Sequence, residues 1–157
     1  MANPFPFSSG DVLTAADLNS IGATETSWTP NFLTGVTVGN GTVDGWYQRV
    51  NNLVVAQGVF VLGSTSAITS DIRVDVPVAG ETYDLSVGTT VQFWDASTGT
   101  VYLGIGRAYG STQVRLRYAQ QSVAAAQALF ANSVSSTVPF TFTTSDRIHW
   151  TMTYRAA

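Results

Sequence analysis

The feature that most constrains the fold is the alternation of apolar and polar residues in short segments. Over residues 147–155 the apolar set is Ile148, Trp150, Met152 and Tyr154, and the polar set between them is Arg147, His149, Thr151, Thr153 and Arg155. A period of two places the two sets on opposite faces of a β-strand, because successive side chains in a strand point to opposite sides. The period of two begins at Trp28 and recurs along the chain. The sequence therefore predicts strands with one buried face.

Turn-forming residues separate these segments at near-regular intervals. The predicted strands are 43–50 and 53–62, joined by Asn51-Asn52; 72–78; 87–95 and 100–108, joined by 96–99; 113–118; and 147–155. Asparagine tolerates the positive φ of a two-residue hairpin turn, and Pro77 is typical of a strand end or edge. Residues 119–136 are interpreted as a long loop that could hold one or two helical turns. About seven or eight short strands at this spacing predict an all-β fold, a jelly-roll-like antiparallel β-sandwich over residues 28–157.

Residues 1–27 differ in character and predict an extended N-terminal arm that carries one short helix. Pro4 and Pro6 keep their surroundings extended, since proline fixes its own φ and disfavours helix in the residue before it. Thr14 and Asp17 form a capping box that predicts a helix over 14–21. A two-turn helix and phenylalanine rings between prolines bury little surface by themselves, so we expect the arm to dock on a partner. The expected attachment residues are Phe5, Phe7, Leu13, Leu18 and Ile21.

The residue composition excludes several classes of function. The 157 residues include no cysteine, no lysine, one histidine and seven arginines, and the net charge is −3. Disulfides, thiolate metal sites, cysteine nucleophiles and multi-histidine zinc sites are therefore excluded. A nucleic-acid-binding surface needs a large basic stripe, which seven arginines in an acidic chain do not supply. No apolar run approaches the roughly 18 residues of a membrane-spanning helix. Taken together, these features of the composition lead us to expect no cofactor, no nucleic-acid partner and no membrane insertion.

Three groups of residues could carry chemistry, and each has a better structural explanation. The segment 104–106, Gly-Ile-Gly, lacks the third glycine and the following helix of a dinucleotide-binding loop, so close packing or a kink within a strand is expected. His149 has no acidic residue at strand spacing to orient it as a general base, and we expect it to face solvent or an interface. Asp71, Arg73 and Asp75 share one strand face, where the charges neutralise each other rather than gather a cation. We therefore expect no enzymatic activity.

The aromatic residues leave one binding question open. Four tryptophans and six tyrosines could form a platform on which sugars stack, but most aromatic residues on alternating strands belong to a core or to a subunit interface. Trp150 is assigned to that core or interface. Tyr102, Tyr109 and Tyr118 remain candidates for contacts with a ligand or with another subunit.

Motifs along nearly the whole chain share one resemblance. They are Phe7 with the segment 10–19 (GDVLTAADLN), the segment 28–30 (WTP), the segment 45–50 (GWYQRV) running into 53–55, the segment 76–78 (VPV), and 138–141 (VPFT) with 146–148 and Tyr154. In these motifs the chain resembles virion proteins of tailed bacteriophages, especially tail-fibre and minor tail proteins. The resemblance implies a jelly-roll β-sandwich, usually a homotrimer, behind an arm that attaches it to the virion, which is assembled in the cytoplasm of the bacterial host.

The chain departs from that family pattern at two points. Asn51-Asn52 stands where a glycine-containing turn is expected, and no shaft separates the arm from the β domain. A compact trimer seated directly on the particle, as a capsid decoration or head-fibre protein, is therefore an alternative to a long receptor-seeking fibre.

The leading functional hypothesis is a non-enzymatic virion structural protein of the minor tail or tail-fibre type. A chain with few charges and many aromatic residues is expected to expose apolar sheet surface as a monomer, and closed symmetric assembly is the usual way to cover it. The expected partners are two further copies of the chain, other virion proteins through residues 1–27, and a glycan or protein of the host surface. The alternatives from other classes are a carbohydrate-binding module that uses loops such as 63–71 or 119–137 and, more remotely, a hydrolase with paired aspartates.

Overall fold

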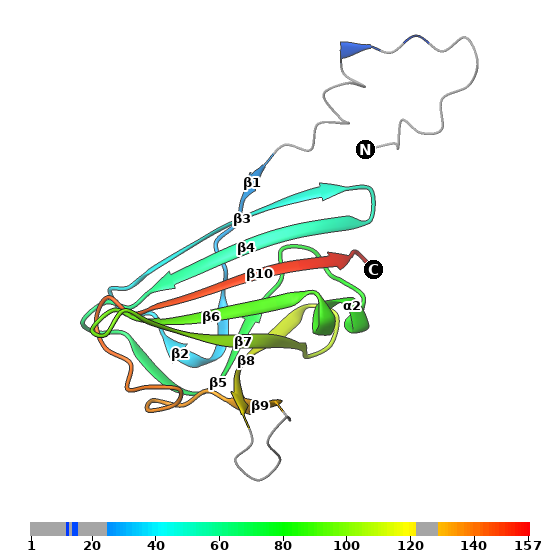
Figure 1. Ribbon diagram of the computed structural model, residues 1–157. Helices are drawn as coiled ribbons and strands as arrows, with labels where there is room; N and C mark the ends of the chain where they lie inside the picture. Colours follow the sequence, from blue (N-terminus) through cyan, green and yellow to red (C-terminus); the bar gives the residue numbers. More distant parts are fainter. Residues whose placement is uncertain (1–11, 13, 16–24, 122–128) are drawn as a thin grey trace.

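β-strands dominate the part of the chain that the computed structural model describes, which comprises residues 12, 14–15, 25–121 and 129–157. The strands are β1 (Thr26–Ser27), β2 (Phe32–Thr37), β3 (Thr42–Val50), β4 (Leu53–Val61), β5 (Ala67–Asp75), β6 (Thr89–Asp95), β7 (Thr100–Ala108), β8 (Gln113–Gln121), β9 (Leu129–Ser133) and β10 (Arg147–Arg155). One short helix, α2 (Thr82–Val87), lies between β5 and β6. Figure 1 shows the strands as one strongly curved sheet.

β10 lies in the middle of this sheet, although the other strands all precede it in the sequence. The strand order is β1-β3-β4-β10-β6-β7-β8-β5-β2, with β9 paired to β8. β10 pairs antiparallel with β4 along its whole length and with β6 over the residues from Arg147 to Met152. A strand flanked on both sides and covered on one face needs an apolar inner face, which is the cause of the alternation over residues 147–155.

The sheet curls so that its last strands cover the core that lies on its first strands. The ring centroid of Phe32 in β2 lies 5.2 Å from that of Phe60 in β4 and 5.8 Å from that of Trp150 in β10. Five strands separate β2 from β4 in the strand order, so these rings meet only because the sheet folds over itself. The largest fully buried side chains between the layers are Trp150, Tyr154, Phe60, Phe93, Ile72, Leu85, Leu116, Ile148, Met152, Val54, Val74 and Val91. The predicted all-β antiparallel sandwich is confirmed, with both layers formed by one continuous sheet.

Most of the predicted strands are confirmed, with shifts of a few residues at their ends. The hairpins at 51–52 and 96–99 are present, and Asn51 has the positive φ, 53°, that a two-residue turn requires. The strand predicted over 72–78 instead runs from Ala67 to Asp75. It ends just before Pro77, which has no backbone N–H to give to a neighbouring strand.

Three expectations about particular segments were wrong. Residues 119–121 continue β8 and residues 129–133 form β9, which pairs with it, where a long loop was expected; residues 122–128 lie outside the described residues. The segment 63–71, expected to be a binding loop, belongs to β5 from Ala67 onward. The strand expected to begin at Val87 begins at Thr89, because residues 82–87 form α2 and bury Leu85 in the core.

Most of the predicted arm lies outside the described residues. This holds for the helix predicted over 14–21, apart from Thr14 and Ala15, and for the attachment residues Phe5, Phe7, Leu13, Leu18 and Ile21. At the end of the arm, Thr26 and Ser27 form β1 and pair with Tyr47 and Trp46 of β3. The sheet therefore begins two residues before the boundary predicted at residue 28.

Tyr154 joins β10 to the segment before α2 and is expected to limit stability at alkaline pH. The side chain is buried, and its hydroxyl donates to the carbonyl oxygen of Val78 at 2.8 Å. Burial raises the pKa of Tyr154 to about 12, from the 10.0 of an unburied tyrosine. As the pH rises, the Tyr154 hydroxyl therefore loses its proton at a lower pH in the unfolded chain than in the folded protein. The free energy of unfolding should be unaffected below pH ~10 and should fall by about 2–3 kcal/mol as the pH rises toward ~12.

Urea unfolding of the wild type and of Tyr154→Phe, from pH ~9 to pH ~11.5, measures this contribution. The variant should start about 1 kcal/mol less stable, because the carbonyl of Val78 loses its donor. Above pH ~10 its stability should then fall less steeply than that of the wild type. Equal slopes in the two proteins would show that Tyr154 does not set the alkaline limit.

Candidate functional site

The outer face of β7 carries a row of exposed aliphatic side chains. Val101, Leu103 and Ile105 occupy alternate positions of this strand and are 49%, 62% and 45% exposed. We call these three residues the apolar stripe. A contiguous row of large aliphatic groups on a rigid strand is the kind of surface that proteins cover with a partner.

Glycine occupies two of the inward positions of β7, on the face opposite the stripe. A Cβ atom on Gly104 would lie 2.9 Å from the ring of Phe93, and one on Gly106 would lie 2.3 Å from the side chain of Thr89. Only glycine fits at these two inner positions, and Val101, Leu103 and Ile105 occupy the alternate, outer positions. The glycines of segment 104–106 therefore serve close packing, as predicted.

A shallow depression lies on the same outer face, over β3, β4 and β10. Its volume is about 210 Å³, and side chains of Asp44, Trp46, Gln57, Val59 and His149 line it. The indole Nε1 of Trp46 donates to Oε1 of Gln57 at 3.1 Å, which holds the ring in place. Pockets that enclose small ligands measure roughly 300–1,000 Å³, so this depression can hold only part of one.

His149 is exposed on the outer face, which confirms its predicted position. Desolvation in the depression lowers its pKa, and the positive charge of Arg147 lowers it further. Val59 lies between Asp44 and His149 in the strand register. The carboxylate therefore does not orient the imidazole, and the pair lacks the contact that a general base requires.

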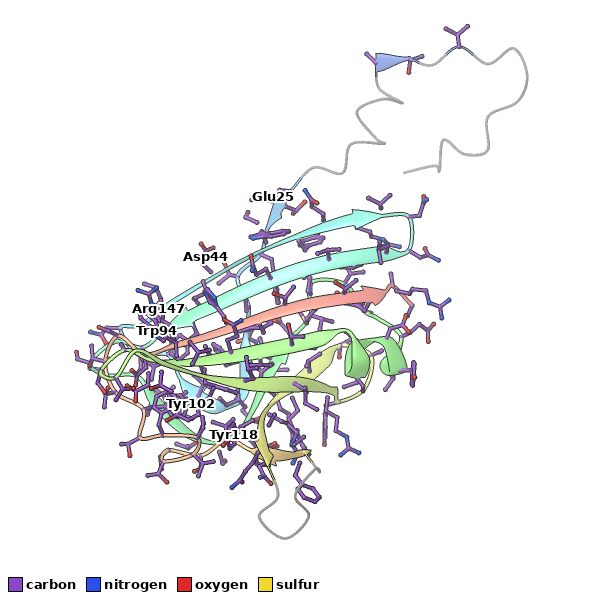
Figure 2. The ribbon with its side chains drawn as sticks, viewed as in Figure 1. Glu25, Asp44, Trp94, Tyr102, Tyr118 and Arg147 are labelled. Carbon is purple, nitrogen blue, oxygen red and sulfur yellow. The ribbon has the colours of Figure 1, made fainter. Side chains whose placement is uncertain are left out.

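A cation–π pair extends the apolar stripe toward the depression. The guanidinium carbon of Arg147 lies 4.3 Å from the ring centroid of Trp94, and Figure 2 shows the two side chains together on the outer face. In the register Arg147 pairs with Trp94, and Trp94 pairs with Val101. The indole thus adds aromatic surface beside the stripe, with one face covered by the guanidinium.

The three tyrosines that the sequence leaves open occupy two environments. Tyr102 and Tyr118 pack against the core, with ring centroids 6.3 Å apart in an edge-to-face contact, and Tyr102 also stacks on Phe140 at 5.2 Å (Figure 2). Tyr109 lies in the turn between β7 and β8 and is 48% exposed. The guanidinium carbon of Arg73 lies 3.8 Å from the Tyr109 ring centroid. Tyr109 is thus the most accessible of the three, and a ligand or interface role for any of them stays a prediction.

Two buried carboxylates that sequence reasoning missed organise the turns at one end of the sheet. Asp146 accepts hydrogen bonds from the backbone N–H groups of Ala96 and Thr143. Asp95 accepts from the N–H and the hydroxyl of Ser97, at 2.9 and 2.7 Å, and the hydroxyl bond holds the pKa of Asp95 below its usual value. The Asp-x-Ser pattern at 95–97 is an Asx-turn signal that sequence reading could have used. The bond from Asp146 to Ala96 joins residues far apart in the sequence, and no local pattern reports it.

Comparisons with known proteins add no assignment. No protein-family model, curated protein sequence or solved structure matches the chain. Among the residues that the structure describes, no group of three or more histidine, aspartate or glutamate side chains is placed to hold a metal ion. In the same part of the chain, no helix has the length and apolar character needed to cross a membrane.

Proposed function

We propose that the chain is a non-enzymatic structural protein of a bacteriophage virion, whose β domain forms a homotrimer and whose residues 1–27 anchor it to the particle. The structural observation that carries the proposal is the apolar stripe. The resemblance of its motifs to those of tail-fibre and minor tail proteins favours a place in the tail, from which the protein can contact the host surface. A capsid decoration or head-fibre protein is the alternative, since no shaft separates the arm from the sheet.

The stripe supports self-association on energetic grounds. Complete burial of one aliphatic side chain contributes about 1.5–3 kcal/mol, and roughly half of that gain is still available at each of the three stripe positions. Closed symmetry repeats the gain at each subunit contact, and a rigid strand loses little conformational entropy when it is covered.

Substitution of Leu103 by aspartate is expected to convert the trimer to monomers, because it places a charge at the centre of the stripe. Light scattering at micromolar concentration should give three times the chain mass for the wild type and the single chain mass for Leu103→Asp. Val50→Asp is the matched control. Val50 is also exposed and aliphatic, but it lies at the β3–β4 turn, so its variant should remain trimeric. A monomeric wild type, or a trimeric Leu103→Asp, would refute the proposed interface.

A carbohydrate-binding module is the second candidate function, favoured by the depression on β3, β4 and β10. Sugar sites combine an aromatic ring with a few polar groups, and Trp46 lies there with Asp44 and His149. The two candidates are separated by the same measurement, since a module of this kind has no need of the stripe and would remain monomeric.

A further inference from the structure

Three arginines lie in one row across three neighbouring strands. In the register Arg73 of β5 pairs with Arg115 of β8, and Arg115 pairs with Arg107 of β7. All three occupy outward positions, because each follows or precedes a buried residue in its strand. Arg117 lies two residues beyond Arg115 on the same face of β8. We call these four residues the arginine row.

The row concentrates positive charge in an otherwise acidic chain. It holds four of the seven arginines, and the same face of β5 adds Asp71 and Asp75, which gives this surface a net charge of +2. The rest of the chain has three arginines and eight acidic residues, a net charge of −5. Like charges directly opposite each other in a sheet lower stability, so the fold tolerates an unfavourable arrangement here.

The carboxylates nearby neutralise only part of the row. Asp71 forms ion pairs with Arg73, at 3.0 Å, and with Arg115, at 2.8 Å. Asp75 is engaged elsewhere, since its Oδ1 accepts the backbone N–H of Asn31 at 2.9 Å.

The other two guanidiniums of the row have no acidic partner within the described part of the chain. Arg107 is exposed and forms no ion pair there. Arg117 donates to the hydroxyl of Ser133 at 3.1 Å, while its Nε is buried without a hydrogen-bond partner. Exposed Arg107 therefore presents donors and positive charge that no acidic group of the described chain satisfies.

Tyr109 adds an aromatic surface at the end of the row. The guanidinium carbons of Arg73 and Arg115 lie 3.8 and 5.3 Å from its ring centroid, so cation–π contacts hold these two groups beside the ring. With 48% of the residue exposed, part of the ring remains open to a ligand.

We propose that the arginine row binds an oxyanion, the carboxylate or phosphate group of a saccharide, with the sugar packed beside Tyr109. Guanidinium forks match both oxyanions through paired N–H donors, and an exposed ring beside them suits a sugar. A nucleic acid fits less well, because one short row of charge on an acidic chain does not follow a polyphosphate backbone. The choice of a saccharide as carrier rests on the host-surface contact in the proposed function, whereas oxyanion binding does not depend on it.

Isothermal titration of the full chain with three probes tests the site: trigalacturonate for carboxylate, glucose 6-phosphate for phosphate, and glucose as the neutral sugar. Either anion should bind and glucose should not. Arg107→Gln should weaken the binding about tenfold or more, since it removes a charged donor. Arg49→Gln makes the same change of charge on exposed Arg49 of β3, outside the row, and should bind as the wild type does.

Thermal unfolding gives a second readout, which a purely structural role would not produce. Arg107→Gln should melt at a higher temperature than the wild type in low-salt buffer, because repulsion within the row is relieved. It should also lose most of the rise in melting temperature that the bound anion gives the wild type. Arg49→Gln should show neither effect.

The outcomes distinguish a carboxylate ligand from a phosphate ligand, and they also show which results would overturn the proposal. Binding of trigalacturonate alone supports a carboxylate ligand, binding of glucose 6-phosphate alone supports a phosphate ligand, and binding of both supports the shared site. Three results would overturn the proposal: no binding of either anion, equal affinities in the wild type and Arg107→Gln, or a trimer that falls apart in Arg107→Gln. The last result would mean that the row faces a second copy of the chain. The first two results would overturn anion binding without bearing on the proposed trimer, which Leu103→Asp tests separately. Failure of this inference is therefore distinguishable from failure of the proposed function.

Discussion

Deletion of residues 2–22 is expected to abolish incorporation of the protein into virions while the β domain stays folded and trimeric. The deletion ends before β1 begins at Thr26, so the strands that make up the sheet remain. The core cluster and the side chains packed against it, as the structure describes them, begin at Trp28. The deletion should therefore leave the stability of the sheet unchanged while it removes attachment to the particle.

On the proposed function the expected loss is large, because each trimer would use the few attachment groups of the arm three times. Burial of the rings of Phe5 and Phe7 supplies roughly 3–6 kcal/mol of gross transfer free energy, reduced by the cost of ordering the arm. Three arms on one trimer gain avidity where the particle offers matching sites. Loss of the arms removes that gain altogether.

Complementation of a phage that lacks the gene, followed by immunoblotting of purified particles, measures incorporation. Phe5→Ala combined with Phe7→Ala is the finer variant. It should weaken incorporation without changing the melting temperature of the free trimer. A truncated protein found on particles at the normal copy number would show that the β domain carries the attachment.

Gly58→Ala is expected to destabilise the fold by about 3 kcal/mol or more, the upper end of the range for overpacking in a core. Gly58 of β4 pairs with Trp150 of β10, and a Cβ atom on it would lie 2.3 Å from Cζ2 of the indole. Trp150 has no room to move aside, because it is only 1% exposed and packs edge-on against Phe32.

Urea unfolding of a double-mutant cycle tests the cause. In the background of Trp150→Phe, which lacks Cζ2, Gly58→Ala should cost much less, so the two changes should be strongly non-additive. Gly99→Ala is the control. Gly99 has a φ of 72° and open space around its Cα, so its variant should lose only about 1–2 kcal/mol from backbone strain. Additive effects of the two core substitutions would contradict the steric explanation.

Local patterns were sufficient to predict most of the strands but not their arrangement, and β2 (Phe32–Thr37) was not predicted. The alternation over 147–155 and the turns at 51–52 and 96–99 arise between chain neighbours, and the structure confirms them. The position of β10 between β4 and β6 depends on pairing between segments far apart in the sequence, which a period of two does not specify. β9 was missed for the same reason, since its pairing with β8 leaves little mark on its composition.

The surface features show the same division between local and non-local information. Tyr102 shares its parity with Gly104 and Gly106, so the close packing predicted for those glycines could have placed it on the inner face. The exposure of the apolar stripe could not be predicted in this way, because alternating aliphatic residues normally indicate a buried face. The arginine row is visible only in the register, where residues from β5, β7 and β8 become neighbours.

The central position of β10 also decides when the protein can fold during its synthesis. Before residues 147–155 leave the ribosome, β4 and β6 have no common partner, and the sheet exists as two separate halves with open edges. Translation adds about 5–20 residues per second, so the nascent chain carries those edges for a measurable time before β10 joins them. The sheet can close only once β10 has been made, because β10 supplies the pairing partner that β4 and β6 share.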